Sequence, residues 1–144
     1  ASKIFCTDCH SNDDTLGPGG PHGSNNKYIL KGNYTTQDFT IESSLSYALC
    51  YQCHDRNSIL NDQSFKEHKK HIVDEAAPCS ACHDAHGISS TQGNSLNNTN
   101  LMNFDITIVQ PNSLGALSFE DLGIFRGSCA LNCHGKDHNS EVYP

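Results

Sequence analysis

Apolar residues along this chain fall into short groups separated by polar and glycine-rich segments. Their spacing predicts a short helix over residues 42–50 and a second helix over residues 58–73. The second helix depends on rough helical periodicity at four apolar positions, which are Ile59, Leu60, Phe65 and Ile72. Pro78 ends this stretch, because proline does not continue a helix.

Residues 87–128 show a different pattern. Apolar and polar residues alternate over 104–108, which predicts a strand, and turn residues follow over 111–115. Residues 116–125 are predicted to return as a second strand, with a role in packing or subunit contact rather than chemistry. The predicted fold class is therefore mostly irregular coil with short α-helices and a small β-hairpin.

The hydrophobic content is too low for an ordinary core of side chains. Hydrophobic residues make up 35% of the 144 residues, tryptophan is absent and the mean hydropathy is −0.53. Fixing the backbone costs about 1–2 kcal/mol per residue, and this inventory offers little burial to offset that cost. Another apolar group is therefore expected to complete the core.

A short motif occurs four times, at residues 6–10, 50–54, 79–83 and 129–134. Three copies read Cys-x-x-Cys-His, the attachment motif of c-type haem, and the fourth has one additional residue between its cysteines. That residue is expected to bulge out, so four covalent haem c groups, each with its iron, are predicted. The thioether cysteines would be Cys6, Cys9, Cys50, Cys53, Cys79, Cys82, Cys129 and Cys133. The proximal iron ligands would be His10, His54, His83 and His134.

Two other uses of these cysteines compete with haem attachment. Zinc sites of four cysteines, or of two cysteines and two histidines, do not require a histidine directly after every second cysteine. Disulfides, which are common in secreted chains, do not require those histidines either. Haems would also form the missing core, so residues 1–144 are expected to be a single tetrahaem domain that is disordered without haem.

Five histidines outside the motifs are candidates for the four distal iron positions. They are His22, His68, His71, His86 and His138. This supply favours bis-histidine ligation of every haem, and Met102, the alternative ligand, is expected to serve packing. His68 and His71 share a face of the predicted helix and can serve different haems.

The spacing of two distal candidates restricts the haems that they can serve. His86 follows His83 by three residues, and His138 follows His134 by four, so neither can reach the opposite face of its neighbour's haem. Each is expected to serve another haem, which would tie haems into close pairs. Each ligating imidazole is expected to donate its second N–H to a carbonyl or carboxylate. Saturated iron leaves no position for a substrate, so the chain is not expected to be an enzyme.

Charge and segment length restrict the partners. The net charge is −7 with neutral histidines, and no basic stripe exists, which argues against nucleic acid as a partner. No segment approaches the length of a membrane span. The chain begins at Ala1, shortly before the first haem cysteine, and haem attachment follows export. We therefore interpret it as an exported chain whose leader has been removed.

Residues 50–87 resemble the doubled Cys-x-x-Cys-His unit of multihaem cytochromes. In that unit one histidine, here His71, precedes the second motif and another, here His86, follows it before a glycine. The tetrahaem count, the short chain and the sequence Cys-His-Gly-Lys-Asp-His over 133–138 are similar to the OmcE-like tetrahaem extracellular cytochromes, which polymerise into nanowires.

This resemblance implies an extracellular or cell-surface homopolymer of head-to-tail subunits that passes electrons to redox proteins or extracellular acceptors. His22, on its glycine- and proline-rich loop, is the candidate for ligating a haem of the next subunit. The family positions favour the other distal candidates over His68, which is expected to be surplus. The alternatives are a monomeric periplasmic electron shuttle and, less favoured, a multihaem reductase.

Overall fold

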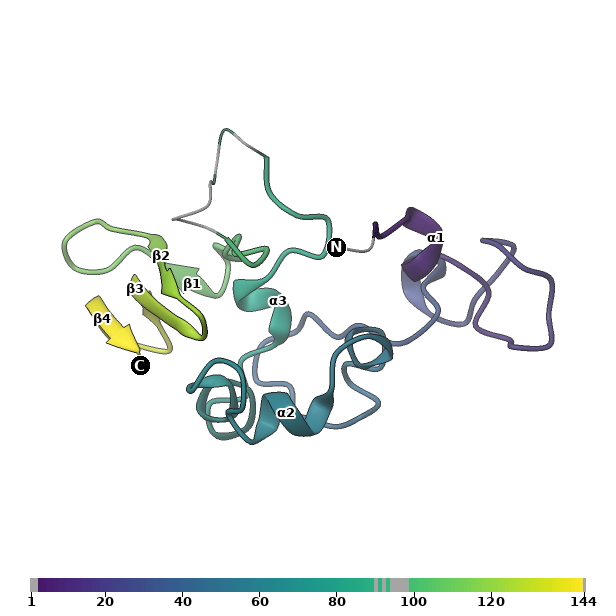
Figure 1. The fold of residues 1–144 in the computed structure, drawn as a ribbon, viewed down its shortest axis with the longest axis horizontal. Helices are drawn as coiled ribbons and strands as arrows, with labels where there is room; N and C mark the ends of the chain where they lie inside the picture. The colour runs from purple at the N-terminus through teal and green to yellow at the C-terminus, as the bar shows by residue number, and fades with distance from the viewer. Residues whose placement is uncertain (1–2, 90, 92, 94–98, 144) are drawn as a thin grey trace. The chain divides into compact units, whose positions relative to one another are not determined.

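The computed structural model describes residues 3–89, 91, 93 and 99–143. Most of this part of the chain is irregular, with short helices and one small antiparallel sheet towards the C-terminus (Figure 1). The predicted fold class is therefore confirmed. No helix within the described ranges is long and apolar enough to cross a membrane.

The helices are single turns or slightly longer, and several coincide with the attachment motifs. The α-helices are α1 (Cys6–Cys9), α2 (Arg56–Leu60) and α3 (Cys79–Cys82). Two 3-10 helices, η1 (Lys27–Ile29) and η2 (Cys50–Gln52), and one π-helical turn, η3 (Lys70–Asp74), complete the set in the described residues. Three of these six segments, α1, η2 and α3, turn the backbone at motif cysteines.

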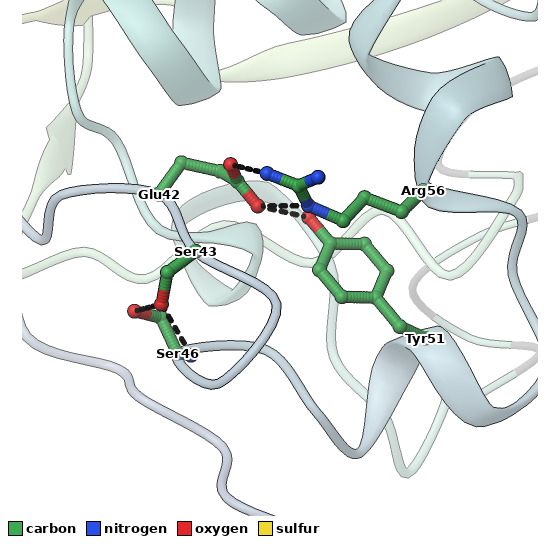
Figure 2. A network of polar contacts seen from close by, with 5 residues as sticks. All are labelled: Glu42, Ser43, Ser46, Tyr51 and Arg56. Atoms are coloured by element: carbon green, nitrogen blue, oxygen red, sulfur yellow. Dashed lines mark hydrogen bonds and ion pairs between the residues drawn. The ribbon is translucent and has the colours of Figure 1, made fainter.

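The helix predicted over residues 42–50 is wrong, because this segment forms turns. The Ser43 hydroxyl accepts a hydrogen bond from the Ser46 N–H at 3.0 Å, and the two hydroxyls lie 2.8 Å apart (Figure 2). A serine side chain that bonds to nearby backbone competes with helix formation. Only at Cys50, the last predicted residue, does the 3-10 helix η2 begin.

The continuous helix predicted over residues 58–73 is also wrong. It is replaced by α2, which ends at Leu60, and by η3, which begins at Lys70. Asp62 has a φ of 54°, a left-handed conformation that a helix interior does not accommodate. Its carboxylate accepts a hydrogen bond from the Lys69 N–H at 2.9 Å, which stabilises the break. The apolar spacing is similar to that of a helix, but the contact of Asp62 with the Lys69 N–H favours a break in the helix.

Four antiparallel strands form the sheet. They are β1 (Val109–Gln110), β2 (Ser118–Gly123), β3 (Arg126–Cys133) and β4 (Lys136–Tyr143). Strand β3 is central, because each of the other three pairs with it. β2 lies within the predicted strand 116–125, but its partner is β3 rather than residues 104–108.

The first strand of the predicted hairpin is wrong. Residues 106–108 form a turn in which the Asp105 carboxylate accepts hydrogen bonds from the Thr107 N–H and hydroxyl, at 2.9 and 2.7 Å. An aspartate that bonds to the backbone two residues ahead favours such a turn. β3, which pairs with β2, contains Cys129 and Cys133. The packing or subunit-contact role expected for residues 104–125 stays a prediction.

The contacts divide the chain into two compact units. Unit 1 comprises Ala1–Thr35 and Glu42–Arg56, and unit 2 comprises Thr36–Ile41 and Asn57–Pro144. Unit 1 contains the first two motifs and unit 2 contains the last two. The expectation of one domain over the whole chain stays a prediction.

The core of buried side chains is small. In unit 2 it consists of Ala81, Val109 and Leu131, with three motif cysteines and three partly buried apolar residues packed against it. Large apolar side chains remain exposed, among them Leu16 at 95% and Ile124 at 85%. This thin core is what the composition predicts for a chain whose main apolar component is a bound group.

Candidate haem-attachment sites

The first motif is a single helical turn. In α1 Cys9 follows Cys6 by three positions, which corresponds to a rise of about 4.5 Å along the helix. The His10 N–H closes the turn by donating to the Cys6 carbonyl at 2.7 Å. His10 itself is extended, with φ −90° and ψ 98°, so its imidazole departs from the helix beside the two thiols.

The third motif repeats this geometry in unit 2. α3 begins after Pro78, and the His83 N–H donates to the Cys79 carbonyl at 2.9 Å. His83 is extended like His10, with φ −109° and ψ 130°. Both motifs therefore present two thiols from one turn, with the histidine directly after it.

A downstream segment, which we call the strap, fixes each of these two histidines. The first strap is residues 28–30, and the second is residues 100–102. The backbone of His10 pairs with that of Leu30, and the backbone of His83 pairs with that of Met102. The first two residues of each strap have positive φ, and their angles are 61° and 55° in the first strap and 56° and 62° in the second.

The straps also hold the histidine rings. Nδ1 of His10 lies 2.7 Å from the Tyr28 carbonyl, and Nδ1 of His83 lies 2.9 Å from the Asn100 carbonyl. Nδ1 of His71 lies 2.7 Å from the Glu67 carbonyl. A ring that donates from Nδ1 presents Nε2 to a metal. The expected N–H···carbonyl contact is therefore confirmed at these three rings, while their ligation of iron stays a prediction.

The straps are a structural repeat that the sequence reasoning missed. The motifs are unevenly spaced, and residues 28–30 share no residue type with 100–102 at equivalent positions. The repeat exists in backbone conformation and hydrogen bonding, which the side-chain pattern does not encode. Met102 is buried within its strap, in agreement with a packing role.

A buried carboxylate, Glu42, contacts one residue inside the second motif and one residue after it (Figure 2). Glu42, whose side chain is only 7% exposed, accepts hydrogen bonds from Arg56 and, at 3.0 Å, from the Tyr51 hydroxyl. Tyr51 lies between the motif cysteines, and Arg56 follows the motif histidine by two residues. The Arg56 guanidinium, more than any other contact, lowers the pKa of the Glu42 carboxyl.

The fourth motif departs from the other three. Cys129 and Cys133 lie four residues apart on the extended strand β3, which separates their Cα atoms by about 13 Å. The expected outward bulge of the additional residue is therefore wrong for this structure. Attachment of one haem to both thiols requires this end of β3 to contract into a turn.

His134 also differs from the other motif histidines. Its Nε2, rather than Nδ1, contacts the Asp38 carboxylate at 3.0 and 3.1 Å. The Phe39 ring stacks on the imidazole with 4.6 Å between centroids. His134 has a φ of 50°, which turns the chain between β3 and β4. Asp38 and Phe39 lie far from it in sequence, and no sequence pattern indicated the contact.

The motif cysteines of each unit lie near one another. In unit 2, burial raises the pKa of Cys82 to about 12 and that of Cys129 to about 11, and neighbouring thiols contribute at Cys82. In unit 1, burial and then the Cys53 thiol raise the pKa of Cys9. Each unit therefore brings two motifs together, as close haem pairs require.

The distal candidates fall into two groups. His68, His71 and His138 lie in unit 2 close to other histidine rings, whereas His22 and His86 are exposed. None of the eight cysteines forms a disulfide in this structure. Among the described residues, no group of three or more His, Cys, Asp or Glu side chains is arranged to hold a metal ion.

Replacement of Glu42 tests the network at the second motif. Because the folded state lowers the pKa of Glu42, its stabilising effect exists above the unfolded-state pKa and is lost as pH falls through the folded-state pKa. Glu42→Gln should therefore lower the free energy of unfolding at neutral pH and have little effect in acid. Tyr51→Phe, which removes one hydrogen bond and keeps the ion pair, should cost about 1 kcal/mol and serves as the control. Denaturant unfolding of the haem-loaded protein measures both, and equal stability of Glu42→Gln and the unmodified protein at neutral pH would contradict this role.

Comparison with known proteins identifies the paired motifs. Residues 1–59, which contain the first two motifs, match the family model described as the doubled CXXCH motif. No curated protein and no solved structure matches the chain. The matched segment covers less than half of the chain, and the third and fourth motifs lie beyond it. Together with the geometry of the motif turns, the match supports a multihaem c-type cytochrome that binds haem c covalently and transfers electrons.

Proposed function

We propose that this chain carries four covalently bound haem c groups and passes electrons between them. The observation that supports this proposal is that four attachment motifs use all eight cysteines, two in each compact unit. Haem supplies one-electron chemistry when it is bound. The contribution of the chain is to attach the haems, orient their iron ligands and exclude water from their edges.

The histidine rings are held in ways that suit this task. The straps fix the orientation of His10 and His83 through Nδ1, and such contacts also raise the basicity of a ligating imidazole. Bis-histidine ligation at every iron would leave no position for a substrate. We therefore expect electron transfer without catalysis at iron.

The number of haems is the first test of this proposal. Intact mass spectrometry of the protein purified after export should show the mass of the chain plus four haems. Cys129→Ser/Cys133→Ser should remove one haem, and Cys79→Ser/Cys82→Ser, at a helical-turn motif, is the matched control that should also remove one. A native mass with three haems would remove the fourth site from the proposal.

Assembly into an extracellular filament is the second part of the proposal. Its supports are the resemblance of the chain to filament-forming tetrahaem cytochromes and the position of His22. This histidine is exposed on the turn over residues 17–23, where it is accessible to a second copy of the chain. A head-to-tail contact that does not close on itself gives an open filament. A monomeric periplasmic shuttle is the alternative.

The variant His22→Ala tests the filament. If this ring ligates a haem of the next subunit, the variant should give soluble protein with one high-spin haem and no filaments in negative-stain micrographs. His22→Met, which retains an axial ligand, should restore low-spin haem and at least short filaments. Compact monomers in the native preparation would favour the shuttle, and normal His22→Ala filaments would exclude His22 as the bridge.

A further inference from the structure

The ring of His138 contacts a carboxylate and a phenol through the same nitrogen. Its Nδ1 lies 3.0 Å from the Glu141 carboxylate and 2.7 Å from the Tyr143 hydroxyl. The three rings whose Nδ1 contacts a backbone carbonyl meet a neutral group there. His138 therefore differs from those three rings, because a full negative charge lies within hydrogen-bond distance of its Nδ1.

A β-bulge in β4 brings both groups to the ring. The register of β4 on β3 passes over Ser140, which has a φ of 60°. In a regular strand, side chains that are three or five positions apart lie on opposite faces. The additional residue reverses the alternation beyond it, so Glu141 and Tyr143 lie on the same face of the sheet as His138. Bulges that re-aim side chains in this way occur next to functional sites.

The His138 ring is fixed and largely shielded from water. Only 8% of the residue is exposed, and the Asn112 side chain donates a hydrogen bond to its backbone carbonyl at 3.0 Å. Glu141 reaches the ring from the solvent side, with 47% of its side chain exposed. An electrostatic contact on a desolvated ring is stronger than the same contact in water. The position of Glu141 thus lets a partly hydrated carboxylate act on a buried imidazole.

The chemistry of a ligating imidazole gives this contact a direction. When Nε2 binds iron, the single proton of the neutral imidazole stays on Nδ1, and the two oxygen groups accept its hydrogen bond. A carboxylate acceptor raises the basicity of a ligating imidazole, and a hydrogen bond to an ionised group is roughly twice as strong as a neutral one. A more basic ligand stabilises ferric iron relative to ferrous iron, which lowers the reduction potential.

We propose that Glu141 acts through the His138 ring to lower the reduction potential of the haem that His138 ligates. Glu141 is thus a positioning residue, which makes this haem a stronger electron donor than a carbonyl at the same nitrogen would. A haem of lower potential passes its electron to neighbours of higher potential, so the contact contributes to the direction of electron flow. This inference rests on the ligation of a haem iron by His138, which belongs to the proposed function.

The variant Glu141→Gln tests this role, because it keeps an oxygen acceptor beside Nδ1 and removes its charge. In a spectroelectrochemical titration of the haem-loaded protein, one of the four reduction potentials should rise and the other three should stay unchanged. Glu120→Gln is the matched control, since Glu120 lies opposite Ser128 in the same sheet and has no described contact with a histidine ring. It should leave all four potentials unchanged, and the absence of any shift in Glu141→Gln would overturn the proposal.

A second comparison separates action through the ring from charge acting through space. His138→Met replaces the imidazole by a thioether ligand without Nδ1 and should itself raise one potential. Glu141→Gln should then cause no further shift in the His138→Met background. An equal shift in both backgrounds would overturn the action through the ring. Unchanged potentials in His138→Met alone would instead remove His138 from the iron ligands of the proposed function.

Discussion

The hydrogen bond between a histidine ring and a backbone carbonyl is the contact on which the sites of this chain depend. A covalent haem can rotate little, but its iron receives a ligand only if the imidazole is held at the right angle. The straps hold the His10 and His83 rings through the Tyr28 and Asn100 carbonyls, and two consecutive residues of each strap have positive φ. Such a backbone is costly for residues other than glycine, so surrounding contacts must maintain it.

The second constraint is the small apolar core. Three fully or largely buried side chains in unit 2 pack against cysteines of both its motifs, so the attachment points themselves form part of the core. Folding and the proposed haem attachment would therefore be linked in this part of the chain. In unit 1 the buried Glu42 carboxylate joins residues within and after the second motif.

The sequence predicted the fold class, but it did not predict the backbone of individual segments. Motif spacing assigned all eight cysteines to haem attachment, which stays a prediction, and composition indicated a mostly irregular fold with a small sheet, which the structure confirms. The two helices failed because Ser43 and Asp62 bond to nearby backbone, an effect that apolar spacing does not report. The contact of Asp38 with His134 and the proximity of histidine rings in unit 2 depend on tertiary structure, which residue spacing alone does not determine.

The straps have a consequence for how such a chain can evolve. The motif turn, its extended histidine and the strap together form a unit that closes through its own backbone rather than through a large shared core. A duplicated or inserted copy would therefore bring its own ligand geometry with it. Chains of this kind can gain redox centres by lengthening, with few compensating changes elsewhere.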